Sequence, residues 1–521
     1  MTLTLEPAAA SASAGFARQV HAEWTKLRTV RGWAIAVIAA ALVTLLLGVY
    51  TGARSQDGCS YGPCNFTVPT GPGGEAVTDA YYLVRQPLTA HGSVTARVTS
   101  LTEAEAEGLT PQGPTSTQPV LVPWSKAGLI ITAGTSQGAQ YAAVLVTGGH
   151  GVRMQWNYTG DRAGLPGTVS PATPRWIRLA RDGDVITGYD SADGDAWTTI
   201  GTVTLPGLAP TVQAGLFATS PDYIEQTSQQ LAGGSSSGPP TMATADFDDV
   251  TVHGGPPRSH WVGASVNGGS RSISYPSGTV AGYRRSGGTF TVTGSGDIAP
   301  GVNGAEPVDF LLAGMFIGLI ALIVVGALFI TAEYRRGLIR VTLAATPQRG
   351  RVLAAKAVVL GTVAFAAGLV GAAGAVLIGT PLLRGNGNPV YPMTVLTEVR
   401  VIVGTALLMA VLAVFALGLG AVLRRGAGAV TAVIASVIVP YVMSAAFPVL
   451  PAGAAQWVLR LTPAAGFAIK QVVPAYPQVT GDYTPSQDYF PVSPWAGLAV
   501  TCAYAAAALI LAVYLLRRRD A

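Results

Sequence analysis

Charged residues are scarce in this 521-residue chain. Asp, Glu, Lys and Arg together make up 11% of it, against roughly 25% in an ordinary soluble domain, and the mean hydropathy is +0.41. This composition excludes a disordered chain and argues against a single soluble globule. It is typical of a membrane protein whose apolar residues fall in runs long enough to cross a bilayer.

Motifs for nucleotide binding and metal catalysis are also missing. The sequence contains no G-x-x-x-x-G-K-[ST] phosphate-binding loop and no H-E-x-x-H zinc motif, and its five histidines are scattered. No basic stripe with interleaved aromatic residues indicates nucleic-acid binding. We therefore expect a protein that is not an enzyme, has no cofactor or metal of its own, and binds no nucleic acid.

Six apolar runs dominate the rest of the sequence. Each is nearly free of charge and near the length of about 20 residues that a membrane span requires. The runs are Trp33–Tyr50, Phe310–Ile330, Ala357–Ile378, Val401–Leu423, Ala429–Phe447 and Trp495–Leu516. A signal peptide is the alternative for the first run, but its exit at Gly48–Ala53 is a poor cleavage site, which favours an uncleaved anchor.

Lys and Arg are distributed unequally around these runs. Fifteen of them flank one side of the predicted membrane and four flank the other. Because cytoplasmic loops carry the excess of positive charge, we expect both termini in the cytoplasm and residues 51–306 outside. Asp309 and Glu398 sit at span ends, where water would reach them. The lack of ionisable residues near mid-bilayer argues against an ion-coupled carrier.

The N-terminal region changes character at Phe16. Residues 1–15 are rich in Ala, Ser and Thr and are predicted to be disordered. Phe16, Val20, Trp24 and Leu27 then recur at helical spacing, which predicts an amphipathic helix in the inner membrane interface. A plain charged anchor is the alternative. Residues 16–50 are thus an interfacial helix followed by span 1.

Residues 51–306 have the pattern of an all-β domain. Short runs that alternate apolar and polar residues, such as Tyr141–Thr147 and Trp176–Arg181, are separated by Gly- and Asp-rich turns. Evenly spaced short strands predict an antiparallel sandwich. We place its core at about residues 78–253 and expect residues 254–306 to form a β-rich stalk that returns the chain to spans 2–6 in residues 307–521. The fold class is therefore a multi-domain membrane protein, with a six-helix all-α domain and an inserted all-β ectodomain.

Two features of the external segment bear on its chemistry. Cys59 and Cys64 would lie outside the cell, where a disulfide between them is plausible; a metal pair is the alternative, but no His or further Cys is near. Five Asp between residues 182 and 195 could suggest calcium. They lack the spacing of a calcium loop, and Asp-Gly turns explain them more simply.

The external segment resembles concanavalin-like jelly-roll modules over roughly residues 78–253. The stretches that carry the resemblance are Trp124–Ile130, Arg175–Gly183, Tyr189–Trp197 and Phe247–Val250. The resemblance implies a sandwich fold and an external glycan or peptide as the kind of ligand. The matched residues are strand and turn framework, so no ligand-contacting residue is carried over.

The loop after span 2 combines both signs of charge with an apolar edge. It reads Glu333-Tyr334-Arg335-Arg336-Gly337-Leu338-Ile339-Arg340-Val341-Thr342-Leu343. Such a stretch can form a short helix that docks in a groove of another protein and transmits motion to the spans. Plain positive charge on the inner side, with a salt bridge, is the alternative.

With this loop in place, residues 16–50 and 308–521 resemble the permease subunits of type-2 ABC transporters, the exporter class. The likeness also includes the interfacial helix, six spans with both ends inside, the Thr462–Phe467 segment and the Arg-rich tail. It implies that the loop is a coupling helix for a separate cytoplasmic ATPase, which binds the ATP and Mg²⁺. The coupling residues are then Glu333, Tyr334, Arg335, Arg336, Gly337, Leu338 and Arg340.

The resemblance further implies a homodimer, or a pair with a sister permease, in the lipid bilayer of the cell membrane. The external segment of 256 residues departs from the family, which has a short loop there. We therefore expect an exporter permease, and keep a membrane-anchored glycan-binding or sensory protein as the alternative. A glycan hydrolase would need paired carboxylates across a cleft, which the sequence does not place.

Overall fold

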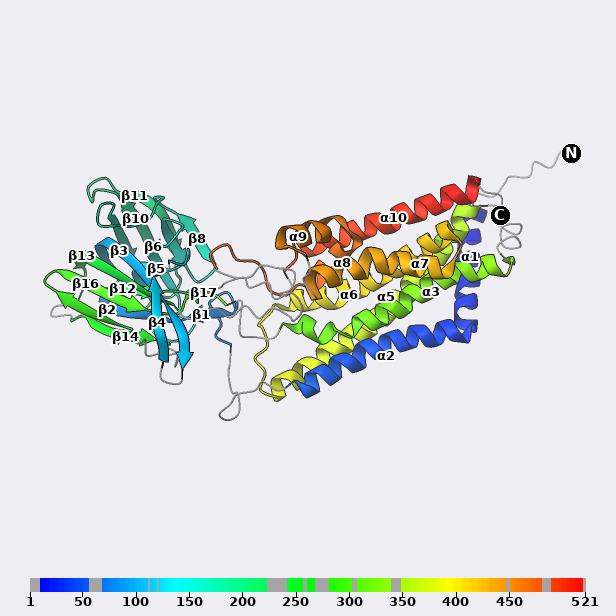
Figure 1. The fold of residues 1–521 in the computed structure, drawn as a ribbon, viewed down its shortest axis with the longest axis horizontal. Helices are drawn as coiled ribbons and strands as arrows, with labels where there is room; N and C mark the ends of the chain where they lie inside the picture. The colour runs from blue at the N-terminus through cyan, green and yellow to red at the C-terminus, as the bar shows by residue number, and fades with distance from the viewer. Residues whose placement is uncertain are drawn as a thin grey trace.

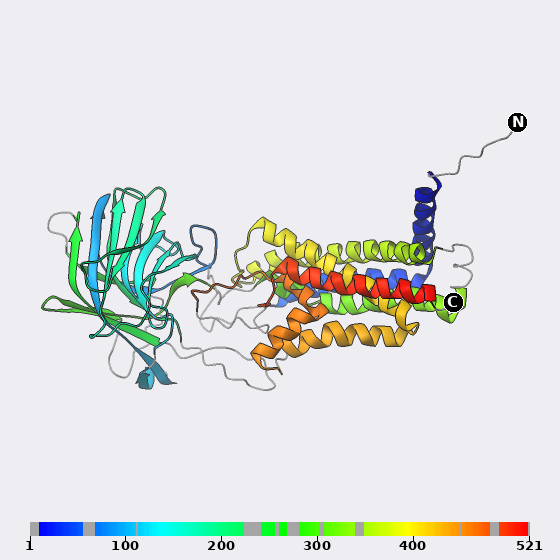
Figure 2. The same cartoon turned by 90° about the horizontal axis from the view of Figure 1, so that it is seen from above.

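In a computed structural model of the chain, the described residues form a β-rich part and a helical part. The described residues are 10–55, 68–110, 113–119, 121–222, 241–255, 260–267, 281–301, 307–338, 348–446, 450–479 and 489–518. The two parts lie end to end, as Figures 1 and 2 show. Helix α1 (Ala10–Thr29) and the C-terminal end of α10 (Pro494–Arg518) are farthest from the sheets.

The helical part consists of long helices, most of them apolar, and short helical segments between them. In chain order these are α1, α2 (Arg31–Arg54), η1 (Val308–Leu312), α3 (Met315–Arg335), α5 (Arg349–Gly385), α6 (Val395–Leu423), α7 (Gly426–Val433), η2 (Ile434–Ile438), α8 (Val439–Tyr441), η3 (Val442–Ala446), α9 (Ala452–Leu461), η4 (Pro463–Lys470) and α10. Within the described ranges, six helical stretches have the length and hydropathy of membrane spans: α2, α3, α5, α6, Gly426–Ala445 and α10. Each overlaps one of the six predicted runs.

The six stretches differ in how deeply they are buried. In α3 and α6, 61% and 67% of the most apolar window is buried, against 22% in α2. Helices α3 and α6 therefore form the interior of the helical part, and α2 lies on its outside. Helix α1 runs across the ends of the other helices (Figure 2).

Small residues let α2 pack closely on α5. A Cβ atom added at Gly48 would lie 2.5 Å from the Cβ of Ala375, and one added at Gly52 would lie 2.6 Å from the carbonyl oxygen of Gly379. Real side chains do not approach so closely, so glycine is required at both positions. This is the close backbone approach that small residues permit between membrane helices.

The β-rich part is a sandwich of two antiparallel sheets. One sheet has the order β11-β10-β9-β3-β13-β16-β15, with β4 paired to β3, and the other has the order β14-β2-β12-β5-β6-β7-β8. The first sheet contains β3 (His91–Thr110), β4 (Gly113–Pro119), β9 (Arg175–Asp182), β10 (Val185–Ser191), β11 (Thr198–Thr204), β13 (Thr241–His253), β15 (Gly282–Ser286) and β16 (Thr289–Gly294). The second contains β2 (Tyr81–Thr89), β5 (Lys126–Thr132), β6 (Tyr141–Thr147), β7 (Val152–Trp156), β8 (Gly160–Ala163), β12 (Thr211–Thr219) and β14 (Val262–Val266).

Alternation along the strands places one face of each sheet in the core. In β9, Ile177 and Leu179 are fully buried, whereas Arg178 between them lies on the other face. Val144 and Phe247, from opposite sheets, belong to the same buried cluster. The side chains of the sandwich core thus come from alternate strand residues, which follows the alternation of apolar and polar residues in the sequence.

The predicted stalk is wrong. Strand β16 pairs with β13 along Phe247↔Phe290 and Ala243↔Gly294, and β14 pairs with β2, so β14 and β16 each extend one sheet of the sandwich. The reason is that Phe290 and Val292 alternate into the core and are buried there. The N-terminal prediction also needs correction, because α1 begins at Ala10 and residues 10–15 are helical rather than disordered.

A two-stranded sheet lies where the chain enters and leaves the sandwich. Strand β1 (Val77–Asp79) pairs with β17 (Ile298–Pro300), with Val77 opposite Pro300. A second link to the helical part comes from Gln478, whose Nε2 donates hydrogen bonds to the carbonyl oxygens of Tyr158 and Thr159 at 3.2 and 3.1 Å. The sandwich is therefore attached through its paired entry and exit strands and through the segment that precedes α10.

Candidate functional site

Four charged side chains meet at the end of the helical part that lies away from the sandwich. Lys356 of α5 donates hydrogen bonds to Glu23 Oε2 at 2.6 Å and to Glu333 Oε1 at 2.7 Å. Lys26 donates to Glu23 Oε1 at 2.8 Å and to Glu333 Oε1 at 3.1 Å. We call these four residues the inner charge cluster. It joins α1, α3 and α5.

The inner charge cluster is largely removed from solvent. Lys356 is fully buried, and Glu23 and Glu333 are 4% and 7% exposed. Burying a single charge in such a place is costly, but two carboxylates and two ammonium groups in hydrogen-bonding contact compensate one another. Lys356 also lies 4.6 Å from the ring centre of Phe329, a cation–π contact.

Lys26 is the more exposed cation of the cluster. Burial alone would lower its pKa, but the hydrogen bond and charge of Glu23, together with the charge of Glu333, raise the pKa above its usual value. The ammonium form of Lys26 is therefore favoured at neutral pH.

The structure divides the predicted coupling residues into two groups. Glu333 belongs to the last turn of α3 and points into the inner charge cluster. Tyr334 is half-buried, with the Arg424 guanidinium 5.2 Å from its ring centre. The remaining described residues are exposed: Arg335, Arg336, Gly337 and Leu338. Arg340 lies outside the described residues.

Helix α3 ends in a turn that presents these exposed residues. The Arg336 N–H donates to the Ala332 carbonyl oxygen and the Gly337 N–H donates to that of Tyr334. Gly337 adopts φ = +67°, which terminates the helix. The predicted helix from Glu333 onward is therefore interrupted by a turn at Arg336 and Gly337. We call the four residues Arg335–Leu338 the exposed turn.

The predicted interfacial helix is α1. Leu27 is buried at 3% exposure, Val20 packs against the same cluster, and Phe16 is half-buried. Trp24 is 41% exposed and lies on another face. Sequence reasoning missed Glu23, although a signal was present: it lies seven residues after Phe16 and four before Leu27, so it belongs to the buried face of the helix.

A second buried ion pair lies toward the sandwich. Lys470 at the end of η4 donates to Asp309 Oδ2 in η1 at 3.1 Å, and both residues are buried. Asp309 is therefore not in contact with water as expected from its place at a span end. Tyr441 packs on Phe467 with ring centres 4.5 Å apart. These contacts hold η4 among α3, α8 and η1.

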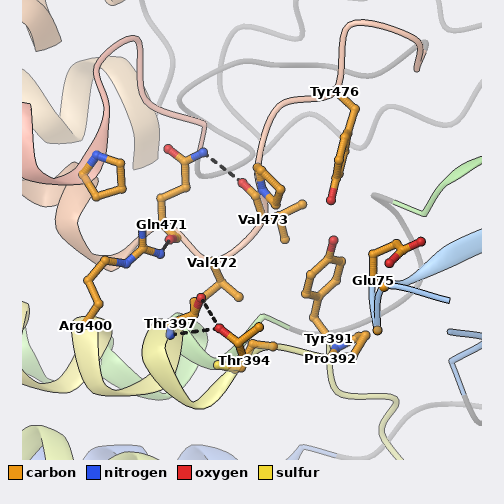
Figure 3. Close-up of a pocket in the computed structure, with 15 residues that line it drawn as sticks. Glu75, Tyr391, Pro392, Thr394, Thr397, Arg400, Gln471, Val472, Val473 and Tyr476 are labelled. Atoms are coloured by element: carbon orange, nitrogen blue, oxygen red, sulfur yellow. Dashed lines mark hydrogen bonds between the residues drawn. The ribbon is translucent and has the colours of Figure 1, made fainter. Parts of the chain in front are cut away.

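A cavity of about 310 Å³ lies between the sandwich attachment and this end of the helices. Figure 3 shows Arg400 of α6 on one side, Tyr391 and Tyr476 in the middle, and Glu75 on the far side. Arg400 Nη2 donates to the Gln471 carbonyl oxygen at 2.5 Å. The cavity is lined by residues 73–75, 391–394, 397, 400, 471–474, 476 and 494.

The Asp residues of the external turns hold backbone N–H groups. Asp193 Oδ1 accepts from the N–H groups of Asp195 and Ala196, both at 2.9 Å, and these bonds lower its pKa. Asp184 accepts from Gly207 and Leu208. In the described part of the chain, no three His, Cys, Asp or Glu residues are grouped as metal ligands. Cys59 and Cys64 lie outside the described residues.

Comparison with known proteins gives one family. A family model described as "ABC-2 family transporter protein" matches residues 185–521, which is more than half of the chain and runs from β10 through all helices after the sandwich. No curated protein matches the chain.

The solved structures that match share only low similarity with the chain. A functionally unknown protein from Saccharomyces cerevisiae is 13% identical, with 33% of this chain and 72% of that chain covered and a TM-score of 0.20. Scytalido-glutamic peptidase with a transition state analog inhibitor is 9% identical, with 42% and 99% covered and a TM-score of 0.25. SCP-B, a member of the Eqolisin family of peptidases in a complex with the tripeptide Ala-Ile-His, is 10% identical, with 42% and 98% covered and a TM-score of 0.24. TM-scores this low carry no argument about this chain.

Proposed function

Because the chain belongs to the ABC-2 family of transporter proteins, we propose that it is the membrane-spanning permease subunit of an ATP-driven exporter. A separate cytoplasmic ATPase binds and hydrolyses ATP with Mg²⁺. Six helices of this chain cross the bilayer. They line the transport path together with a second copy or a sister permease.

The inner charge cluster is the observation that supports coupling to such an ATPase. It joins α1, α3 and α5, and its member Glu333 lies only two residues before the exposed turn, Arg335–Leu338. A force applied to the exposed turn therefore acts on three helices at once, since buried ion pairs with short hydrogen bonds resist separation. The ATPase docks on the exposed turn, and Glu333 acts behind it as a positioning residue.

The distribution of charge supports the proposed orientation. Most of the Lys and Arg residues that flank the helices lie on the same side as the exposed turn, as the positive-inside rule requires of a cytoplasmic face. Helix α1 and the C-terminal end of α10 lie on this side, and the sandwich lies on the opposite side (Figure 1). The sandwich is therefore extracellular, where it receives or senses a transported molecule.

Co-purification tests the coupling. The full chain is tagged and isolated from its native membrane, and retained ABC ATPase is identified by its phosphate-binding loop. Arg335→Glu with Arg336→Glu should abolish retention, because the docking turn changes from positive to negative. Arg284→Glu with Arg285→Glu, an exposed pair on β15, is the charge-matched control. Retention by the first variant at the level of the second would contradict the proposal and favour a membrane-anchored binding protein.

Surface labelling tests the orientation. Single cysteines are introduced at Thr211 and Arg336, both exposed, after the native cysteines are replaced by serine. A reagent that cannot cross the membrane should modify the Thr211→Cys variant in intact cells. It should modify the Arg336→Cys variant only after the cells are opened. The opposite pattern would invert the topology.

A further inference from the structure

Arg400 lines the cavity and forms no ion pair with a carboxylate of the residues that the structure describes. A guanidinium has five N–H donors. Nη2 bonds the Gln471 carbonyl oxygen, and Nε is buried with no hydrogen-bond partner among the residues that the structure describes. No ion pair of Arg400 occurs there either. Glu398 is two residues away and so projects from another side of α6.

Two other cations at this end of the helices, Lys470 and Arg460, are accommodated differently. Lys470 is paired with Asp309. Arg460 donates from Nε to the Pro491 carbonyl oxygen and lies 5.1 Å from the ring centre of Trp457. Arg400 differs from these two cations because it lines the cavity and its buried Nε–H has no hydrogen-bond partner among the described residues. A buried donor without a partner costs free energy, which an incoming oxyanion would recover.

The walls of the cavity suit an apolar or aromatic group. Val472 and Val473 line it, and Tyr391 and Tyr476 lie across it with their hydroxyl groups directed at one another (Figure 3). Burial raises the pKa of both phenols, so they remain neutral. Glu75 lies on the far side from Arg400, beyond the tyrosines.

The N-terminus of α6 adds to the positive potential at this wall. Thr394 caps the helix by accepting a hydrogen bond from the Thr397 N–H at 3.3 Å, and both residues line the cavity. The partial positive charge of a helix N-terminus favours a nearby anion. It acts on the same side of the cavity as Arg400.

We propose that this cavity binds a small molecule with one oxyanion, a phosphate or carboxylate, and an apolar or aromatic body. Arg400 holds the oxyanion, since guanidinium groups bind phosphate and carboxylate through paired N–H donors. Val472, Val473 and the two tyrosines contact the body. The volume of about 310 Å³ is at the lower end of the range for small-molecule sites. The site does not depend on an ATPase.

Calorimetric titration with hexyl phosphate tests the site. The full chain is placed in phosphatidylcholine nanodiscs, and hexanol is the neutral control ligand. Hexyl phosphate should bind saturably, hexanol should not, and Arg400→Gln should weaken binding by at least tenfold. Arg460→Gln, which removes an equal charge on the same side, should bind like the unmodified chain.

Two further variants guard against loss of folding as the explanation. Val473→Trp keeps Arg400 but fills the cavity, and should also weaken binding at least tenfold. Arg400→Lys keeps the charge and should recover part of the affinity. Unchanged affinity in Arg400→Gln, or no saturable binding of hexyl phosphate to the unmodified chain, would overturn the proposal.

Native mass spectrometry distinguishes the two sources of the ligand. The chain is extracted directly from its membrane, with Arg400→Gln alongside. A phospholipid retained by the unmodified chain and lost from the variant identifies the ligand as a membrane lipid. Binding of hexyl phosphate with no retained lipid identifies a water-soluble anion. Because neither assay contains an ATPase, failure here leaves the coupling proposal standing, and failure of coupling leaves this site standing.

Discussion

Lys356 Nζ lies 2.6 Å from Glu23 Oε2, although 333 positions separate the two residues in the chain. The contact joins α1, which crosses the ends of the helices that lie away from the sandwich, to the first turns of α5. With Glu333 and the half-exposed Lys26 it forms a set of four residues whose formal charges sum to zero. The helices in this corner cannot move independently without separating opposite charges.

The first prediction concerns the balance of the inner charge cluster. Lys356→Met leaves two buried carboxylates with Lys26 as the remaining cation of the cluster, so we expect the free energy of unfolding to fall by about 3–5 kcal/mol. The thermal midpoint of the full chain in detergent, followed by tryptophan fluorescence, measures the loss. Adding Glu23→Gln restores neutrality and should recover at least half of it.

Arg351→Met is the control for that experiment, because Arg351 is an exposed cation on the same helix. It should leave the midpoint within about 0.5 kcal/mol of the original stability. If the double variant Glu23→Gln with Lys356→Met is no more stable than Lys356→Met alone, the four charges do not act as one compensated set.

The second prediction concerns Asp309 and Lys470. Lys470→Met removes the ammonium group that pairs with the buried Asp309 carboxylate. The loss of this ion pair should weaken the attachment of η4 to η1. Hydrogen exchange of residues 463–470 should become faster in the full chain. Asp309→Asn combined with Lys470→Met should restore slow exchange, because it removes both charges. Equal exchange in all three proteins would show that the pair does not hold η4.

The third prediction tests the close contact of α2 with α5. Gly48→Ala introduces a Cβ 2.5 Å from both the Ala375 Cβ and the Leu311 carbonyl oxygen. We expect a loss of about 1–3 kcal/mol in stability from overpacking. Gly32→Ala lies on the same helix with nothing within 4 Å of the new Cβ, and should be neutral or stabilising by about 0.5–1 kcal/mol. Equal effects of the two substitutions would contradict the packing argument.

The fourth prediction is a pH dependence in the sandwich. Burial raises the pKa of Asp79 to about 6, although hydrogen bonds from Gly138, Tyr158 and Asn267 oppose the shift. The unfolded carboxyl ionises near its ordinary value of 3.8, so folding favours the protonated form. The contribution of Asp79 to the free energy of unfolding is therefore complete below about pH 4 and is lost as the pH rises to about 6.

Asp79→Asn should remove this dependence. Relative to that variant, the unmodified chain should lose stability on the order of 3 kcal/mol between pH 4 and pH 7, measured as the difference in unfolding free energy. Asp195→Asn, at an exposed position, should follow the unmodified chain at every pH. A constant difference between Asp79→Asn and the unmodified chain would show that Asp79 ionises normally in the folded state.

Local pattern predicted the elements of this fold well. The strand predicted at Tyr141–Thr147 is β6 with the same bounds, and that predicted at Trp176–Arg181 is β9 shortened by one residue at each end. Both follow from alternation over neighbouring residues. The apolar runs likewise correspond to α2, α3, α5, α6, Gly426–Ala445 and α10, because lipid-facing helices must be apolar over their whole length.

Contacts between distant segments could not be predicted in the same way. Lys356 and Lys26 counted only as positive charges near the predicted inner membrane face, because the contacts of Lys356 with Glu23 and Glu333 join segments far apart in sequence. Residues 289–294 had the strand pattern, but their pairing with β13 depends on the place left in the core for Phe290. The cavity at Arg400 is formed by three segments far apart in sequence.

The pairing of β1 with β17 has an evolutionary consequence. Val77 faces Pro300, so the chain enters and leaves the sandwich at adjacent points. The helical segments on either side of the sandwich, α2 and η1, are also in contact through Gly48 and Leu311. A brief connector could bridge that gap if everything between the two strands were excised. The sandwich is thus an inserted unit that a lineage could gain, exchange or discard while the arrangement of the helices stayed the same.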